Sequence, residues 1–273
     1  MRNLLILILG CVCFYAQAQE YSWKCIDMGG TRTGCVAASA ENIGQALGCF
    51  RGEVYVAPNG NEFPASSSVA AVAAIVLNAQ PAMASVKKVI GHSAQAMHTA
   101  RSETMLSRWF VDIVMNKVSD LSDKKVDVGI CNFGGIRVDM PKGDVILDDI
   151  LSMFPFRNNV IYIEHKGKTI RNILESMASG RFEVLGGVKV VAEDGRLVSV
   201  EIDGEPLDDE KVYGLATNSF LLNGGDGLYL ASDALLVQDL GLLVNDVVLE
   251  HIKAETAAGR ALSGRKDGRV TIR

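Results

Sequence analysis

The feature that most constrains the fold is a hairpin signal in the second half of the chain. Residues 186–204 read GGVKVVAEDGRLVSVEIDG, in which two valine-rich runs flank the pair Asp194-Gly195. Asp-Gly is a favoured two-residue hairpin loop because both positions need a positive φ, which aspartate tolerates and glycine adopts freely. The flanking strands must therefore pair antiparallel, and a fold built only on a parallel sheet is excluded.

Helical patterns alternate with strand-like runs along the rest of the chain. The clearest helix is expected over residues 101–118, with Arg101 and Glu103 in its first turn. A second is expected over 168–180, where Gly180 marks the C-terminus. Further helices are expected over 66–86, with a break near Pro81, and over 243–255, and strands are expected over 124–131, 158–167, 211–220 and 267–273. The chain is therefore of the mixed α and β class.

The first 20 residues, MRNLLILILGCVCFYAQAQE, have the pattern of a secretory signal peptide. Arg2 precedes an apolar stretch, and residues 16–18 form a small-x-small cleavage site, which predicts a leader over 1–18 and a mature start at Gln19. The apolar stretch is shorter than the roughly 20 residues that a membrane-spanning helix needs. Lipid attachment at Cys11 is the weaker alternative. The sequence thus predicts an exported protein, periplasmic or extracellular, with no transmembrane span.

The chain has six cysteines, two of which lie in the expected leader. An exported protein can form disulfides. The remaining cysteines are Cys25, Cys35, Cys49 and Cys131. A disulfide is plausible between two of the first three, and which two is left open. Cys131 lies in a strand-like run and is expected to be a small buried apolar residue.

Charge and composition exclude one class of partner. The 273 residues are 48% hydrophobic and carry a net charge of −5, which corresponds to a pI of about 5.5. This composition indicates a packed core. A nucleic-acid-binding surface is usually strongly basic, so no nucleic-acid partner is expected. A small anionic ligand held by a few local arginines remains compatible with these numbers.

Two glycines and an arginine follow a strand-like run at residues 132–137, NFGGIR. Gly134 and Gly135 can adopt a positive φ and let a ligand approach the backbone. Arg137 offers a planar fork of donors that suits phosphate or carboxylate. Two interpretations are open at this point, an anion-binding turn and a plain connection with a surface arginine.

Two other stretches could contribute to a ligand site. Asp226 lies between glycines in NGGDG, where it is free to accept hydrogen bonds from hydroxyl groups, and Phe220 is expected to close the strand before this loop. Phe154 and Phe156 flank Pro155, which breaks regular structure and permits one ring to face a cleft and the other the core. Burial of both rings in the core is the commoner arrangement.

Three motifs, in order and spacing, resemble the C-terminal substrate-binding domain of the 5′-nucleotidase/UDP-sugar hydrolase family. They are NFGGIR at 132–137, FPFRN at 154–158 and NSFLLNGGDG at 218–227. The likeness covers residues 86–273 and leaves residues 19–85 as an N-terminal extension of unknown role. It implies an α+β fold of the 5′-nucleotidase C-terminal type, a mixed sheet flanked by helices.

The resemblance implies a binding role for particular side chains. Phe156 and Phe220 match the two phenylalanines that sandwich the base, and Arg101 and Arg137 match the arginines that hold the phosphate. Stacking on aromatic rings tolerates different bases, and a guanidinium suits phosphate.

The same resemblance assigns polar contacts and the loops that carry them. Asn132 and Asn158 match asparagines that contact substrate, and Asp226 matches the aspartate that accepts from the ribose hydroxyls. The glycines of the matching loops are Gly134, Gly135 and Gly225.

The chain departs from the family in its expected chemistry. The family's N-terminal domain is a two-metal phosphoesterase with ligands in D-x-H, G-D and G-N-H-[DE] patterns. None of the four histidines of this sequence, His92, His98, His165 and His251, lies in such a pattern. No catalytic residue, metal ligand or cofactor is therefore expected in this chain, and His92 and His98 are expected to be structural or surface residues.

Three functions are compared on this basis. The favoured one is binding of a nucleotide or nucleoside phosphate in nucleotide breakdown, with a separate metallophosphoesterase chain that supplies the divalent metal and the hydrolysis. The alternative is a capture protein for nucleotides or nucleosides without a catalytic partner. A self-sufficient hydrolase that uses Asp139, Asp148 or Asp149 is disfavoured, because paired aspartates at a helix start are usually capping residues.

Overall fold

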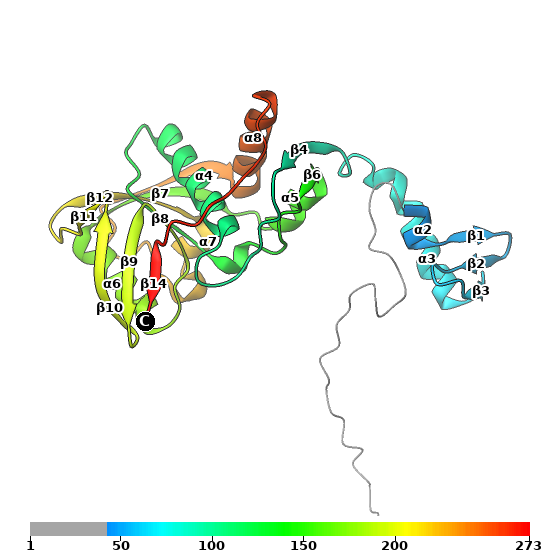
Figure 1. Cartoon of the computed structure of the whole chain (residues 1–273), viewed down its shortest axis with the longest axis horizontal. Coiled ribbons are helices and arrows are strands. Elements are labelled where there is room, and N and C mark those ends of the chain that lie inside the picture. The colour runs from blue at the N-terminus through cyan, green and yellow to red at the C-terminus, as the bar shows by residue number, and fades with distance from the viewer. Residues whose placement is uncertain (1–42) are drawn as a thin grey trace, which may run out of the picture. The chain divides into compact units, whose positions relative to one another are not determined.

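The computed structural model describes residues 43–273, which divide between Gln80 and Pro81 into two compact units, 43–80 and 81–273 (Figure 1). The expected leader, its alternative lipid site and the cysteines Cys25 and Cys35 lie outside the described residues. No helix of residues 43–273 is long and apolar enough to cross a membrane.

The smaller unit contains a three-stranded antiparallel sheet. Its strands are β1 (Cys49–Arg51), β2 (Val54–Val56) and β3 (Glu62–Pro64), preceded by helix α2 (Ile43–Leu47). Tyr55 is buried, and its hydroxyl donates to the Leu47 carbonyl at 2.8 Å. Helix α3 (Ser68–Met83) follows and ends two residues after Pro81. Cys49 is a free, exposed thiol.

The larger unit is built on a five-stranded mixed sheet in the order β13-β7-β12-β5-β8. Only β12 and β5 run parallel, and the other neighbours are antiparallel. The strands are β5 (Val128–Cys131), β7 (Asn159–Lys166), β8 (Val184–Gly186), β12 (Val212–Asn218) and β13 (Leu236–Leu243). The mixed sheet confirms the expected fold class.

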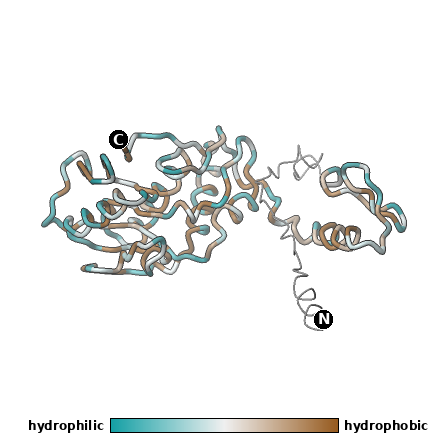
Figure 2. Tube along the Cα trace, turned by 90° about the horizontal axis from the view of Figure 1, so that it is seen from below, coloured by the Kyte–Doolittle hydropathy of each residue, from teal (hydrophilic) through white to brown (hydrophobic). Residues whose placement is uncertain are grey.

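Hydrophobic cores cover both faces of this sheet. The alternating residues Val160 and Tyr162 of β7 lie in one core, whereas Ile161 and Ile163 lie in the other. The first core includes helices α4 (Met105–Ser122), α5 (Leu147–Met153) and α8 (Val244–Ala257), and the second includes α6 (Gly167–Ser179). Figure 2 shows hydrophobic segments through the middle of this unit and hydrophilic outer loops. Because β5 and β8 are buried on both sides, these two strands are apolar throughout, whereas the edge strand β13 is largely exposed and contains polar residues.

The predicted hairpin is present in a second sheet, with the order β11-β10-β9-β14. Strands β9 (Val188–Glu193) and β10 (Arg196–Ile202) pair from Glu193 and Arg196 outward, so Asp194 and Gly195 form a two-residue loop. Both loop residues have a positive φ, 48° and 74°, as this turn requires. The other strands are β11 (Glu205–Pro206) and the closing strand β14 (Val270–Ile272). A two-stranded sheet of β4 (Val89–Ser93) and β6 (Gly143–Ile146) completes the unit.

Two paired glycines let α4 approach the central sheet. Gly129 of β5 pairs with Gly186 of β8. A Cβ at Gly129 would lie 2.7 Å from side-chain atoms of Met115 and Val111, and one at Gly186 would lie 2.5 Å from the Met115 sulfur. Any larger residue would push the helix away, so these glycines are needed for close packing rather than for an unusual backbone conformation.

Helix α4 begins later than the sequence pattern predicts. Thr104 is its N-cap: its hydroxyl accepts from the Ser107 N–H at 3.0 Å, and the Ser107 hydroxyl accepts from the Thr104 N–H at 2.9 Å. This capping box fixes the first helical residue at Met105. Arg101 and Glu103 therefore precede the helix, and the expectation that they form its first turn is wrong.

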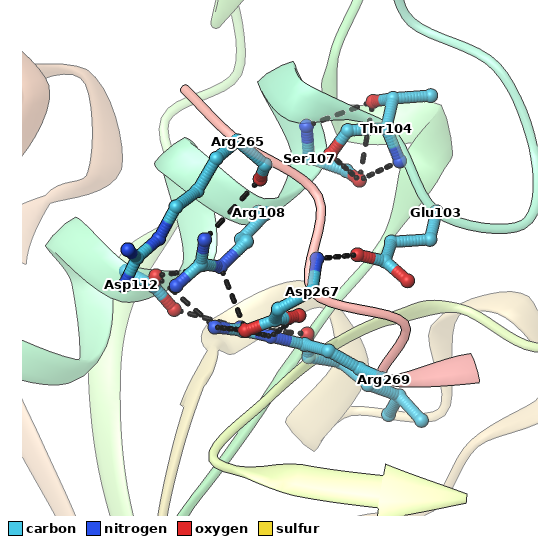
Figure 3. A network of polar contacts seen from close by, with 9 residues as sticks. Glu103, Thr104, Ser107, Arg108, Asp112, Arg265, Asp267 and Arg269 are labelled. Atoms are coloured by element: carbon cyan, nitrogen blue, oxygen red, sulfur yellow. Dashed lines mark hydrogen bonds and ion pairs between the residues drawn. The ribbon is translucent and has the colours of Figure 1, made fainter. Parts of the chain in front are cut away.

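A buried arginine joins the closing segment to α4 (Figure 3). The Arg269 guanidinium donates to both carboxylate oxygens of Asp112, at 2.7 and 3.1 Å, and to Asp267 at 3.0 Å. Arg108 also contacts Asp267 at 3.1 Å. Burial lowers the pKa of Arg269, but the two carboxylates outweigh this and leave the pKa raised. The network pins the last strand against the helix.

Stability is expected to decrease at acid pH because of His165. This side chain is fully buried on β7, and its Nε2 donates to the Leu230 carbonyl at 2.9 Å. Burial lowers the pKa of His165, an effect that the Leu230 hydrogen bond and the charge of Asp233 only partly oppose. A base with a lowered pKa in the folded state binds its proton first in the unfolded chain. The stability it contributes is therefore complete above the unfolded pKa of about 6.5 and is lost as the pH falls below that value.

Urea unfolding at pH 7.5 and 5.5 measures this effect. When the pH is lowered from 7.5 to 5.5, the free energy of unfolding of the wild type is expected to fall by about 1 kcal/mol more than that of His165→Leu. The variant Gln238→Leu introduces the same residue at an exposed, non-ionisable position of β13; it is the control and should keep the wild-type pH dependence. Equal losses in the wild type and in His165→Leu would contradict the assignment.

Candidate functional site

The residues singled out from the sequence gather at one edge of the central sheet. Strands β5 and β12 end there, at Cys131 and Asn218. Strands β7 and β8 begin at the same edge, because Val160 pairs with Asn218 and Val184 pairs with Cys131. Loops that are distant in sequence are therefore neighbours in space.

The turn after β5 carries Asn132 and Arg137, and it differs from the expectation for its glycines. Residues Phe133–Gly135 form a single 3-10 turn, and neither Gly134 nor Gly135 has a positive φ. A Cβ at Gly135 would lie 3.0 Å from Asn132 Oδ1. The glycine thus leaves room for the Asn132 side chain, a contact that a positive-φ interpretation of the sequence does not include.

Asn132 is held by a second buried asparagine at the same sheet edge. The Asn218 amide donates to Asn132 Oδ1 at 3.1 Å, and both side chains are buried. Asn218 Oδ1 accepts from the Leu221 N–H at 3.1 Å and so caps the short helix α7 (Ser219–Leu222). Because Asn132 accepts through its oxygen, its amide nitrogen remains as a donor.

The two phenylalanines of FPF separate as the sequence permits. Phe154 is buried in the core, whereas Phe156 is 47% exposed. Phe156, Asn132, Asn158 and Gly135 line a crevice of only about 10 Å³. Ligand pockets usually measure roughly 300–1,000 Å³. A base can therefore enter beside Phe156 only if the crevice widens.

Phe220 lies in α7 and not in a strand, which corrects its expected place. The Asn218 cap starts the helix one residue after β12 ends. The ring is 39% exposed. A Cβ at Gly225 would lie 2.4 Å from this ring, so Gly225 must lack a side chain for the NGGDG loop to pack on Phe220.

Arg101 and Asp226 line a common cavity of about 310 Å³. Asp226 is exposed and has a φ of 51°, within the short turn η2 (Gly225–Gly227). The rest of the wall includes Gly180, Arg181 and Glu183. The cavity thus brings together a cation that suits phosphate and a carboxylate that suits hydroxyl groups.

Arg137 lies on the crevice side of the site. Its guanidinium carbon is 6.0 Å from the centre of the Phe156 ring, and its Nη1 donates to the Gly134 carbonyl at 3.2 Å. The side chain is exposed and leaves most of its donors free. The structure therefore places some of the expected residues at the crevice and Arg101 and Asp226 at a separate cavity. Four expected residues line neither of them: Gly134, Arg137, Phe220 and Gly225.

Two residues of this edge are absent from the sequence-based set, Asn218 and Glu183. Asn218 is the last residue of the apolar strand β12. A single amide side chain at the end of such a strand is a sequence signal for a residue that contacts a ligand. Glu183 is buried just before β8 and contacts both Arg101 and Phe133. Its sequence context, RFEV, contains no comparable signal.

The two histidines that the sequence assigns to the surface are each paired with an aspartate. His92 and His98 are exposed, as expected, and lie 3.2 Å from Asp144 and 2.8 Å from Asp139. Partial burial raises the pKa of Asp139, but hydrogen bonds from the Thr99 N–H and His98 leave it lowered. Among residues 43–273, no three His, Cys, Asp or Glu side chains are placed to hold a metal ion.

Residues 85–233 match the model of a protein family described as "5′-nucleotidase, C-terminal domain". The chain belongs to this family. Membership gives it a nucleotide-related function and confirms the resemblance drawn from the three motifs.

Individual relatives match only part of their own length. The "Silent protein UshA(0)" of Salmonella typhimurium is 36% identical over 126 residues, which are 43% of this chain and 23% of that protein. The "Trifunctional nucleotide phosphoesterase protein YfkN" of Bacillus subtilis is 28% identical over 192 residues, 64% of this chain and 13% of that protein. The chain thus spans less than a quarter of the length of each of these two relatives.

A solved structure supports the fold over a longer stretch. The 5′-nucleotidase precursor of Thermus thermophilus superposes with a TM-score of 0.66 at 24% identity, and the match covers 81% of this chain and 50% of that chain. At this identity the likeness establishes the fold of the 5′-nucleotidases.

Proposed function

We propose that the chain binds a nucleoside phosphate at the sheet edge described above. The observation that carries the proposal is the cavity shared by Arg101 and Asp226 in a domain of the 5′-nucleotidase family. A guanidinium and a carboxylate on one wall match a phosphate and a vicinal diol, the two polar ends of a nucleotide.

The remaining side chains have complementary roles in this proposal. The exposed rings of Phe156 and Phe220 stack on the base. Arg137 adds a second phosphate contact. The amide nitrogen of Asn132 and the half-buried side chain of Asn158 provide further polar contacts to the substrate. The glycines that keep these loops close to the ligand are Gly134, Gly135 and Gly225.

The proposed biological context is nucleotide breakdown after export. Hydrolysis would be supplied by a separate metallophosphoesterase chain, because the histidines of this sequence do not form the family's metal motifs.

The proposal of export rests on the first 20 residues. N-terminal sequencing of protein recovered outside the cytoplasm tests it, and the sequence is expected to begin at Gln19. The second candidate is a capture protein, which is favoured by the same cavity if no catalytic partner is found.

Binding calorimetry with AMP and adenosine tests the proposed site through Arg137. Arg137→Ala is expected to weaken AMP binding by about 1.5–3 kcal/mol, since it removes charged hydrogen bonds to the phosphate. Adenosine binding should stay within about twofold of the wild type. Arg196→Ala, at an exposed arginine of β10, is the matched control and should change neither affinity. Equal losses for both ligands would show that Arg137 does not contact phosphate.

A further inference from the structure

A buried carboxylate forms part of the wall of the Arg101–Asp226 cavity. Glu183 is 5% exposed and immediately precedes β8. A buried ionised carboxylate is costly unless its oxygens are paired. The partners of Glu183 therefore indicate why an acid is placed there.

Both oxygens of Glu183 bind elements that carry site residues. Its Oε1 accepts from Arg101 Nη1 at 3.0 Å. Its Oε2 accepts from the Phe133 N–H at 2.7 Å, in the turn between Asn132 and Gly134. One side chain thus joins the segment before α4 to the turn after β5.

The position of Arg101 is fixed by these contacts. Its guanidinium carbon lies 5.6 Å from the centre of the Phe133 ring, and Phe133 itself is held by Glu183. Arg101 has five N–H donors, of which the ion pair with Glu183 uses one on Nη1. The other donors are available to a ligand, because the Arg101 side chain is 41% exposed at the cavity.

We propose that Glu183 is a positioning residue that holds the Arg101 guanidinium at the cavity wall and fixes the Asn132 turn, so that a ligand with a phosphate is favoured over the bare nucleoside. This inference rests on the proposed nucleotide site. It assigns Glu183 a role that acts through Arg101, because both of its carboxylate oxygens are already paired within the protein.

The variant Glu183→Gln separates the two contacts. Glutamine keeps an oxygen that accepts from the Phe133 N–H, but it has no negative charge to pair with Arg101. The turn is expected to stay in place and Arg101 to lose its fixed position. AMP affinity should fall about tenfold, which corresponds to about 1.4 kcal/mol, and adenosine affinity should stay within about twofold. Glu205→Gln, which removes the same charge from an exposed position of β11, is the control and should change neither.

A double-mutant cycle with Arg101→Ala tests whether Glu183 acts through Arg101. In the Arg101→Ala background, Glu183→Gln is expected to change AMP affinity by less than about twofold. Urea unfolding of each variant shows whether it folds, and Glu183→Asp, which keeps the charge, should recover part of the AMP preference.

The outcomes are distinct. A wild type that binds neither AMP nor adenosine overturns the proposed site, and this inference with it. With wild-type binding present, three results would overturn the role of Glu183 alone: unchanged or tighter AMP binding by Glu183→Gln, equal losses for AMP and adenosine, or an undiminished effect in the Arg101→Ala background.

Discussion

Phe156→Ala and Phe220→Ala are each expected to weaken nucleotide binding by about 1–3 kcal/mol, because base stacking on an aromatic ring is of this size. Both rings are exposed at the sheet edge where β12 ends and β7 begins. Losing a ring removes a contact with the base and not with the phosphate, so AMP and adenosine should be affected equally. Calorimetry with the two ligands measures the losses.

The exposed phenylalanine Phe50 provides a matched control. Its exposed fraction of 38% is close to the 39% of Phe220, but it lies on β1 in the smaller unit. Phe50→Ala should leave both affinities unchanged. Unchanged affinity in both Phe156→Ala and Phe220→Ala would remove the sandwich from the proposal. A loss only in Phe220→Ala would indicate that the narrow crevice at Phe156 does not open for the base.

Much of the fold could be predicted from the conformational preferences of short stretches of the sequence. The Asp194-Gly195 loop predicted a hairpin because the positive φ of its residues is a property of the loop itself. The end of β5 could also be placed, since its apolar run stops just before Asn132. The end of β12 could not, because Asn218 ends the strand and caps α7 two residues before the expected end at Phe220. The start of α4 was missed by a few residues because Thr104 and Ser107 form a capping box that outweighs the periodic pattern.

The parts that sequence could not supply depend on tertiary register. Gly135 was expected to allow an unusual backbone conformation, but it makes room for Asn132, and only the folded turn brings the two together. Glu183 reaches the site because Cys131 pairs with Val184, which sets its neighbour beside Phe133. No local pattern encodes such a pairing between distant strands.

The isolated chain is expected to release no phosphate from nucleoside monophosphates above background, with Mn²⁺, Zn²⁺ or Mg²⁺ present. This follows from the proposal that the chain binds the substrate and that a separate metallophosphoesterase chain catalyses its hydrolysis. In the family that the chain resembles, the metal pair provides an activated water near neutral pH. The residues of this chain would bind and orient the nucleotide, with Arg137 and Arg101 on the phosphate and Asp226 on the ribose.

Addition of a metallophosphoesterase domain from a two-domain relative is the complementary measurement, with phosphate release as the readout. A complex in trans lacks the high effective concentration that a linker provides, so turnover should rise with the concentration of the added domain. A stable complex would need to bury roughly 1,200–2,000 Å². Asp226→Asn should reduce the turnover of the mixture, whereas Glu205→Gln, on the edge strand of another sheet and outside the cavity wall, should not. Robust turnover by the purified single chain that is lost in Asp226→Asn or Arg137→Ala would contradict the division of labour and would favour a self-sufficient hydrolase.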